Sequence, residues 1–157
     1  MIANVVGLFG KITGTLYFDP PDIGRLSAEA EIDVSSMSTG NKPRDEHLLS
    51  AEILDAAKYS RIVFKTTRVE PARNNRGRVT ADLTIRGITR SISFEVEFLG
   101  PVKSPFSGRP SIGFRGATRI NREDYGIVLD YPMEGGGLVV GKEVEITFDL
   151  QADPAAD

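Results

Sequence analysis

Apolar and polar residues alternate along most of this chain. From Leu26 to Val34 every second residue is apolar, and the residues between them are serine, glutamate or aspartate. Alternation of this length is typical of a β-strand that buries one face. The pattern recurs, clean or weakened, in six further segments. The sequence therefore predicts seven strands, at residues 10–19, 25–34, 61–69, 77–87, 88–100, 111–121 and 142–151.

Residues that favour turns separate neighbouring strands, as in the segments 74–77 (NNRG) and 86–87 (RG). A single apolar face per strand is typical of an antiparallel sheet with one dry side. Closing such a sheet into a barrel buries the apolar faces and removes most of the edges. We therefore expect an all-β fold built as an antiparallel β-barrel.

The segment 43–58 interrupts the alternation. Pro43 suits the first position of a helix, and Asp45 and Glu46 complement the helix dipole near that end. Apolar residues then recur at helical spacing, at Leu48, Leu49, Ile53 and Leu54. We expect a short helical insertion here, in one piece or two, between the second and third strands.

The inward faces of the predicted strands mix large and small side chains. An eight-stranded barrel can be filled by its own side chains or can hold one small ligand. The large residues would form apolar walls: Leu16, Phe18, Ile32, Phe64, Leu83, Phe94, Phe114 and Phe148. The small residues would leave room for a ligand: Gly14, Ala28, Ala81 and Gly116. This mixture favours a hollow apolar lumen; the alternative is that the phenylalanine rings fill the space.

Arg90 falls on the apolar face of its strand, between Ile88 and Ile92. An unpaired charge on that face is costly unless it reaches water or a partner. Arg90 lies near the start of the strand. It could therefore contact an acidic or phosphate head group at the barrel rim, or extend its guanidinium into solvent.

His47 is the only histidine, and the chain has no cysteine. Any metal site or Ser-His-Asp arrangement would therefore depend on His47. Consecutive helical residues point about 100° apart, so Asp45, Glu46 and His47 do not converge on one ion. Glu52 and Asp55 are near in sequence, but neither lies four residues from His47. The structural interpretation is that these charges start the helix; an enzyme centred on His47 is the other.

The composition removes several classes of function. The chain has 157 residues, of which 40% are hydrophobic and 26% charged, as in an ordinary globular domain. Its net charge of −3 argues against a nucleic-acid partner, because phosphate neutralisation needs a basic face. No apolar run reaches the roughly 18 residues of an integral membrane segment. The N-terminus lacks the basic region and cleavage site of a signal peptide. We expect a cytoplasmic protein without a cofactor, or a periplasmic or secreted one if the natural start lies upstream.

Four short motifs, in order along the chain, resemble those of the YceI-like proteins. The segment 6–14 (VGLFGKITG) is similar to V-x-G-x-F followed by glycine. The segment 39–48 (TGNKPRDEHL) is similar to T-G-x-x-x-R-D-x-H-L. The segments 82–89 (DLTIRGIT) and 120–126 (INREDYG) are similar to D-L-T-I-x-G-V-T and I-N-R-x-D-[FY]-G.

This resemblance implies a lipocalin-like barrel of about eight strands with a helical insertion. The implied ligand is a polyisoprenoid, an isoprenoid quinone or a similar long amphipathic lipid in the lumen, and the implied role is not enzymatic. Arg44, Asp45 and His47 would then be a signature of the fold. The resemblance runs to Ala152, so we expect one domain at 1–152 and a flexible tail at 153–157.

The resemblance also raises a question about closure of the barrel. Members of the family begin with a further strand ahead of the V-x-G-x-F motif, whereas only residues 1–5 precede it here. A typical strand has about 5–6 residues. We therefore expect either a longer natural chain or a barrel left open beside the first strand. Because an open edge can pair with a second chain, a homodimer is one expected outcome.

Overall fold

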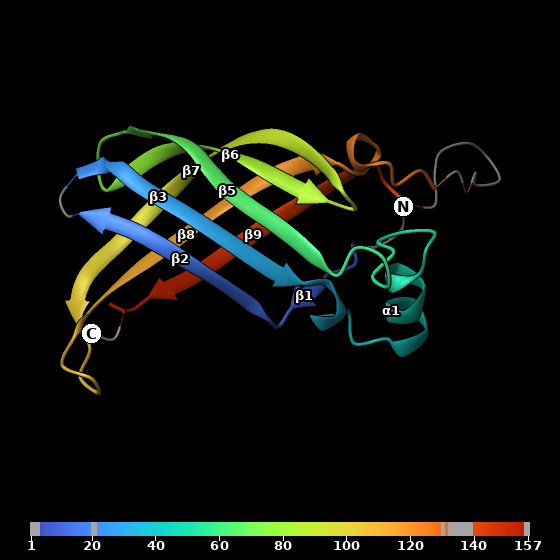
Figure 1. Ribbon diagram of the computed structural model, residues 1–157, viewed down its shortest axis with the longest axis horizontal. Helices are drawn as coiled ribbons and strands as arrows, with labels where there is room; N and C mark the ends of the chain where they lie inside the picture. Colours follow the sequence, from blue (N-terminus) through green and yellow to red (C-terminus); the bar gives the residue numbers. More distant parts are fainter. Residues whose placement is uncertain (1–3, 20–21, 130, 132–139, 156–157) are drawn as a thin grey trace.

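The computed structural model describes residues 4–19, 22–129, 131 and 140–155. Figure 1 shows one curled sheet with a small helical insertion at one end. All seven predicted strands are confirmed, and neighbouring strands are antiparallel. They are, in their order across the sheet, β2 (Ile12–Asp19), β3 (Asp22–Asp33), β5 (Arg61–Pro71), β6 (Arg76–Ile85), β7 (Ile88–Lys103), β8 (Pro110–Asn121) and β9 (Glu143–Ala152).

Short elements lie at the insertion end of the sheet. The two-residue strands β1 (Leu8–Phe9) and β4 (Met37–Ser38) pair with each other. Between β3 and β4 runs the 3₁₀ helix η1 (Val34–Ser36), and a second one, η2 (Arg122–Tyr125), follows β8.

The insertion contains the helix α1 (Lys42–Leu49). Asn41 caps it by accepting a hydrogen bond from the Arg44 backbone N–H at 3.0 Å, and Pro43 occupies the first turn as expected. The chain leaves the helix at Ser50, and residues 51–58 form turns instead of continuing the helix. The predicted insertion is therefore confirmed, but only its first half is helical. Within the described residues no helix has the length and apolarity to cross a membrane.

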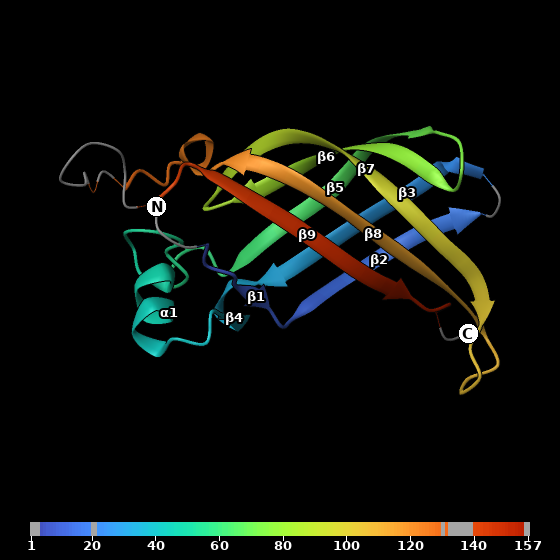
Figure 2. The same cartoon turned by 180° about the vertical axis from the view of Figure 1, so that it is seen from behind.

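The sheet curls into a half-barrel that, over the described part of the chain, does not close. β2 and β9 are its two edges, and within the described residues neither pairs with a strand on its outer side. Figure 2 shows both edge strands from behind. Full closure of a barrel, the first expectation, is thus replaced by the open form. Burial falls towards the edges: Ala81 in the central strand β6 is 0% exposed, whereas Ile12 in β2 is 43% and Val144 in β9 is 41% exposed.

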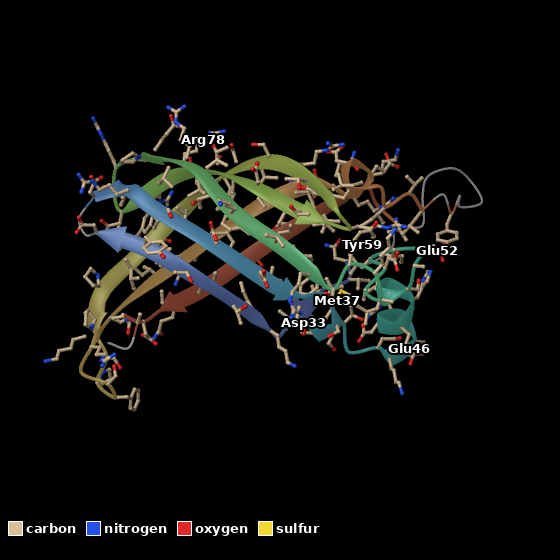
Figure 3. All side chains as sticks on the ribbon, viewed as in Figure 1. Asp33, Met37, Glu46, Glu52, Tyr59 and Arg78 are labelled. Carbon is tan, nitrogen blue, oxygen red and sulfur yellow. The ribbon has the colours of Figure 1, made fainter. Side chains whose placement is uncertain are left out.

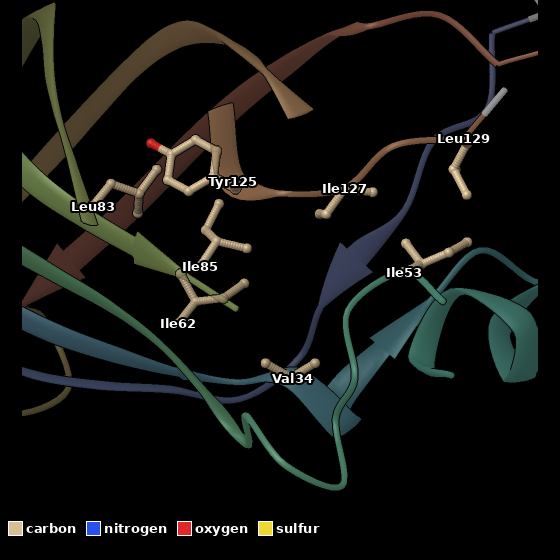
Figure 4. Packing of buried hydrophobic residues seen from close by; sticks show 8 residues of the cluster. All are labelled: Val34, Ile53, Ile62, Leu83, Ile85, Tyr125, Ile127 and Leu129. Atoms are coloured by element: carbon tan, nitrogen blue, oxygen red, sulfur yellow. The ribbon is translucent and has the colours of Figure 1, made fainter. Parts of the chain in front are cut away.

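Two apolar clusters lie on the concave face. The insertion-end cluster joins strands β5 and β6 to the insertion, to η1 and η2 and to the segment after η2 (Figure 4). Its buried residues are Val34, Ile53, Ile62, Leu83, Ile85, Tyr125, Ile127 and Leu129. The aromatic cluster occupies the middle of the half-barrel, with buried residues Leu26, Val79, Ala81, Phe94, Val96, Phe98 and Phe114. Ile92 packs against both clusters and so connects them.

Arg122 fixes the segment that carries Tyr125. Its buried guanidinium donates hydrogen bonds to four backbone carbonyls, those of Ile127, Leu129, Val140 and Gly141. These bonds offset the cost of burying the charge. Gly126 closes η2 in the left-handed conformation, with φ of 71°, which favours glycine at this position.

Candidate functional site

The predicted lumen residues lie on the concave face of the half-barrel. Leu83 belongs to the insertion-end cluster and Ile32 packs against it. Ala81, Phe94 and Phe114 belong to the aromatic cluster, and Leu16, Phe18, Phe64 and Phe148 pack against it. Ala28 pairs with Leu16 across β2 and β3, and Gly116 with Phe148 across β8 and β9. The alternation in the sequence thus brought all of these residues to one surface.

The aromatic rings meet across this surface. Phe94 on β7 lies between Phe64 on β5 and Phe148 on β9, with ring centroids 6.1 and 5.4 Å apart. Phe98 similarly contacts Phe18 and Phe114, at 6.0 and 5.3 Å. Rings therefore occupy the middle of the half-barrel.

Two of the predicted small residues do not leave open room. A β-carbon built on Gly116 would lie 2.7 Å from Phe148 Cζ and 2.8 Å from the Glu95 carbonyl oxygen. One built on Gly14 would lie 2.5 Å from the Glu29 carbonyl oxygen. The space beside Gly116 is thus occupied by a ring, and that beside Gly14 by the backbone of β3. We correct the expectation accordingly: these glycines permit close approach of neighbouring atoms.

The sheet splits between β7 and β8 at the insertion end. Pairing of the two strands runs from Val96↔Gly116 to Lys103↔Pro110, away from the insertion. Among the described residues, β7 pairs with β6 only from Ile88 to Glu95, and β8 pairs with β9 only from Ala117 to Asn121. A cavity of about 260 Å³ lies at this split. Its lining includes Arg90, Ile92, Thr118, Ile120, Asp124 and Tyr125.

Tyr125 and Arg90 are two polar residues among those that line this cavity. Tyr125 is 1% exposed, and its hydroxyl has no hydrogen-bond partner within the described part of the chain. Burial raises the pKa of this phenol and Asp124 raises it further, whereas Arg90 acts in the opposite direction. Arg90 is exposed, and its Nε–H donates to the Asp124 carbonyl oxygen at 3.2 Å. Arg90 therefore lies at the end of the half-barrel, where the rim was expected.

A second cavity, of about 460 Å³, lies at the other end of the sheet. Leu99, Val102, Ile112 and Leu150 are among the residues that line it.

His47 contacts Glu52, a pair that sequence spacing did not suggest. Its Nε2 lies 2.9 Å from Glu52 Oε2, and the Tyr131 hydroxyl donates to the other carboxylate oxygen of Glu52. Hydrogen bonds from Tyr131 and His47 lower the pKa of Glu52, and the contact with Glu52 raises the pKa of Tyr131. Figure 3 shows Glu52 on the insertion, outside the curled sheet.

Arg44 and Asp45 hold the segment before the helix. Asp45 accepts a hydrogen bond from the Thr39 N–H at 2.9 Å and another from its hydroxyl. Arg44 donates to the Thr39 hydroxyl and carbonyl oxygens, at 2.8 and 3.1 Å. Among the residues that the structure describes, no group of three or more His, Cys, Asp or Glu side chains could hold a metal ion.

Comparison with known proteins assigns the fold. The YceI-like domain family matches residues 1–152. The chain belongs to this family. It is 37% identical over 153 residues to UPF0312 proteins of Staphylococcus aureus strains N315 and MW2, covering 98% of this chain and 85% of each relative.

Two solved structures superpose on this chain over nearly its whole length. The Campylobacter jejuni YceI protein that crystallizes with large solvent channels superposes with a TM-score of 0.88 at 26% identity, covering 99% of this chain and 88% of that one. Burkholderia cenocepacia BcnA superposes with a TM-score of 0.79 at 25% identity, covering 97% and 90%. None of these four names refers to a reaction.

Two of the four YceI-like motifs supply hydrogen bonds and turns within the fold. The segment 120–126 (INREDYG) supplies Arg122, with its hydrogen bonds to backbone carbonyls, and the left-handed Gly126. The segment 39–48 (TGNKPRDEHL) supplies the hydrogen bonds between Thr39, Arg44 and Asp45 and the start of α1.

Proposed function

We propose that this protein is a non-catalytic carrier of a long apolar chain, such as a polyisoprenoid or the tail of an isoprenoid quinone. The observation that supports the proposal is the apolar concave face, which is buried at its middle and exposed at its two edge strands. It runs through both clusters and remains accessible at the edges, where Ile12, Val144 and Leu150 are each more than a third exposed. Extended apolar surface of this kind is characteristic of binding sites.

The energetics of such a site depend on chain length. Burial of an apolar chain contributes about 0.8 kcal/mol per methylene group, against the entropy lost on binding. An isoprene unit has five carbons, so each additional unit that fits on the concave face contributes up to about 4 kcal/mol before the entropy loss. Binding should therefore tighten by at least about tenfold per unit.

The aromatic cluster sets a condition on binding. Phe64, Phe94 and Phe148 meet in the middle of the half-barrel, so a chain that runs its whole length must displace at least one ring. Phe148 is suited to this movement because it lies on the edge strand β9.

The proposal is tested by titrating delipidated protein with geraniol, farnesol and geranylgeraniol, which differ by one isoprene unit each. The carrier function predicts that affinity rises along this series. Equal affinities, or no binding of any of the three, would contradict it. An enzyme centred on His47 predicts instead that His47→Ala removes an activity or a bound ion. The carrier function predicts only a small change in stability, because His47 is half exposed.

The open edges favour a second candidate, an interaction domain with a filled core. β2 and β9 each present unpaired backbone groups, within the described residues, to a further strand. This alternative predicts a homodimer whose population rises with protein concentration, and no lipid in an extract. Sedimentation at several concentrations, with and without geranylgeraniol, distinguishes the two.

A further inference from the structure

The cavity between β7 and β8 combines an apolar connection to the concave face with polar groups at its mouth. Ile92 lines the cavity and also packs against both apolar clusters, so the cavity adjoins the surface proposed to hold the lipid chain. A chain lying on that surface could thus place its head group at the split.

The Tyr125 hydroxyl has the properties of a binding group. It is buried without a partner within the described residues, which is costly because a buried hydroxyl loses its hydrogen bonds to water. Arg122 and Gly126 hold the backbone on either side of it. In Figure 4 the hydroxyl points away from Ile127, towards the strands of the sheet above Leu83.

Arg90 adds further donors at the same cavity. A guanidinium carries five N–H donors. One of them bonds the Asp124 carbonyl oxygen, and among the described residues Arg90 has no ion pair with a carboxylate. Arg90 and Tyr125 can therefore donate to the same kind of group, an acceptor oxygen.

The charges around the cavity favour a neutral group. Arg90, Arg119 and Asp124 line the cavity. Arg119 is already ion-paired with Glu143 and Glu145. The effects of Asp124 and Arg90 on the pKa of Tyr125 are opposite in sign. A carboxylate beside the site would repel a phosphate, whereas a carbonyl oxygen accepts hydrogen bonds without a net charge.

We propose that Tyr125 and Arg90 anchor an uncharged, oxygen-bearing head group, such as a quinone carbonyl, at the split between β7 and β8. The inference rests on the proposed carrier function, since the chain of the same molecule would lie on the concave face. Tyr125 donates a hydrogen bond to the head-group oxygen from inside the cavity, and Arg90 donates from its mouth.

The test compares three probes on delipidated protein, by displacement of the fluorescent dye N-phenylnaphthylamine. They are a menaquinone with a geranylgeranyl side chain, geranylgeranyl diphosphate and the hydrocarbon phytane. The wild type should bind the menaquinone more tightly than the other two. Tyr125→Phe should weaken menaquinone binding by roughly 3- to 10-fold, the effect of one hydrogen bond, and leave phytane binding unchanged.

Matched variants separate a binding role from a structural one. Arg90→Met should act in the same direction as Tyr125→Phe, whereas Tyr17→Phe and Arg78→Met, on exposed side chains, should change nothing. The melting temperature of ligand-free Tyr125→Phe should equal or exceed that of the wild type. A lower melting temperature together with weaker phytane binding would show a structural hydroxyl and overturn the anchor.

The remaining outcomes are also decisive. If the wild type binds none of the probes, the carrier function fails and the anchor with it. If the wild type and Tyr125→Phe bind the menaquinone equally, the carrier function stands and the anchor is wrong. If the diphosphate binds most tightly and Arg90→Met abolishes that binding, the head group is anionic and the neutral-head-group proposal is overturned.

Discussion

The ring of Phe148 lies against Gly116, so close that a β-carbon on Gly116 would come within 2.7 Å of Phe148 Cζ. The two residues are paired across β8 and β9. Because Phe148 also contacts Phe94, at 5.4 Å between ring centroids, the glycine lets an edge-strand ring reach the middle of the half-barrel.

Gly116→Ala tests this contact. The new methyl group would meet the Phe148 ring and, at 2.8 Å, the Glu95 carbonyl oxygen. Since the backbone oxygen cannot rotate away, we expect a loss of about 1–3 kcal/mol in the free energy of unfolding. Urea denaturation measures it. Gly40→Ala would be a poor control because φ is 75° there, whereas Gly10→Ala is a suitable one because the nearest atom beyond its chain neighbours would lie 3.8 Å from the new β-carbon. An unchanged midpoint for Gly116→Ala would contradict the contact.

Phe148→Ala tests whether the rings occupy the path of the ligand chain. Removal of the ring should lower the free energy of unfolding by about 2–3 kcal/mol, because the side chain is only partly buried. The same variant should bind geranylgeraniol more tightly than the wild type does, since no ring has to move. Fluorescence displacement measures the affinity, and Phe106→Ala, at a side chain that is 99% exposed, is the control. Weaker binding by a folded Phe148→Ala protein would show that the ring is part of the binding wall.

Arg122→Met tests whether the Arg122 hydrogen bonds fix the segment that carries Tyr125. It would remove four hydrogen bonds and leave buried carbonyl oxygens without a donor. We expect a loss of about 3 kcal/mol or more in the free energy of unfolding. Arg78→Met, on an exposed side chain, should stay within about 0.5 kcal/mol of the wild type. Similar urea midpoints for the two variants would show that the Arg122 hydrogen bonds do not stabilise the fold.

Asp45 predicts a specific dependence of stability on pH. Hydrogen bonds from Thr39 lower its pKa below the ordinary value of 3.8. The unfolded chain therefore binds a proton at a higher pH than the folded chain, and the stabilisation is lost as pH falls below about 4. Urea midpoints at neutral and acidic pH should converge for Asp45→Asn and the wild type as pH falls. A constant difference between them down to acidic pH would show that this carboxylate is not stabilised by Thr39.

The sequence predicted the parts of the fold that depend on periodicity. Alternation placed Leu83, Phe94 and Phe114 on one face because successive side chains of a strand point to opposite sides. It could not show the split between β7 and β8, because both strands keep their alternation where their pairing ends.

The missed contacts depend on how the chain turns. Glu52 reaches His47 because the helix ends at Leu49 and turns follow over residues 51–58, whereas the sequence left open whether the helical segment was in one piece or two. The contact between Gly116 and Phe148 depends on the register of two strands about thirty residues apart in sequence. A small residue facing inward looks the same in sequence whether it faces a cavity or a ring.

The most direct test of the carrier function is to purify the protein natively, extract it with organic solvent and analyse the extract by mass spectrometry. The carrier function predicts a stoichiometric lipid with a long apolar chain, and the Tyr125–Arg90 anchor predicts that its head group is neutral and bears oxygen. An extract without lipid, from a sample shown to be folded by circular dichroism, would contradict the carrier function and favour the filled-core interaction domain.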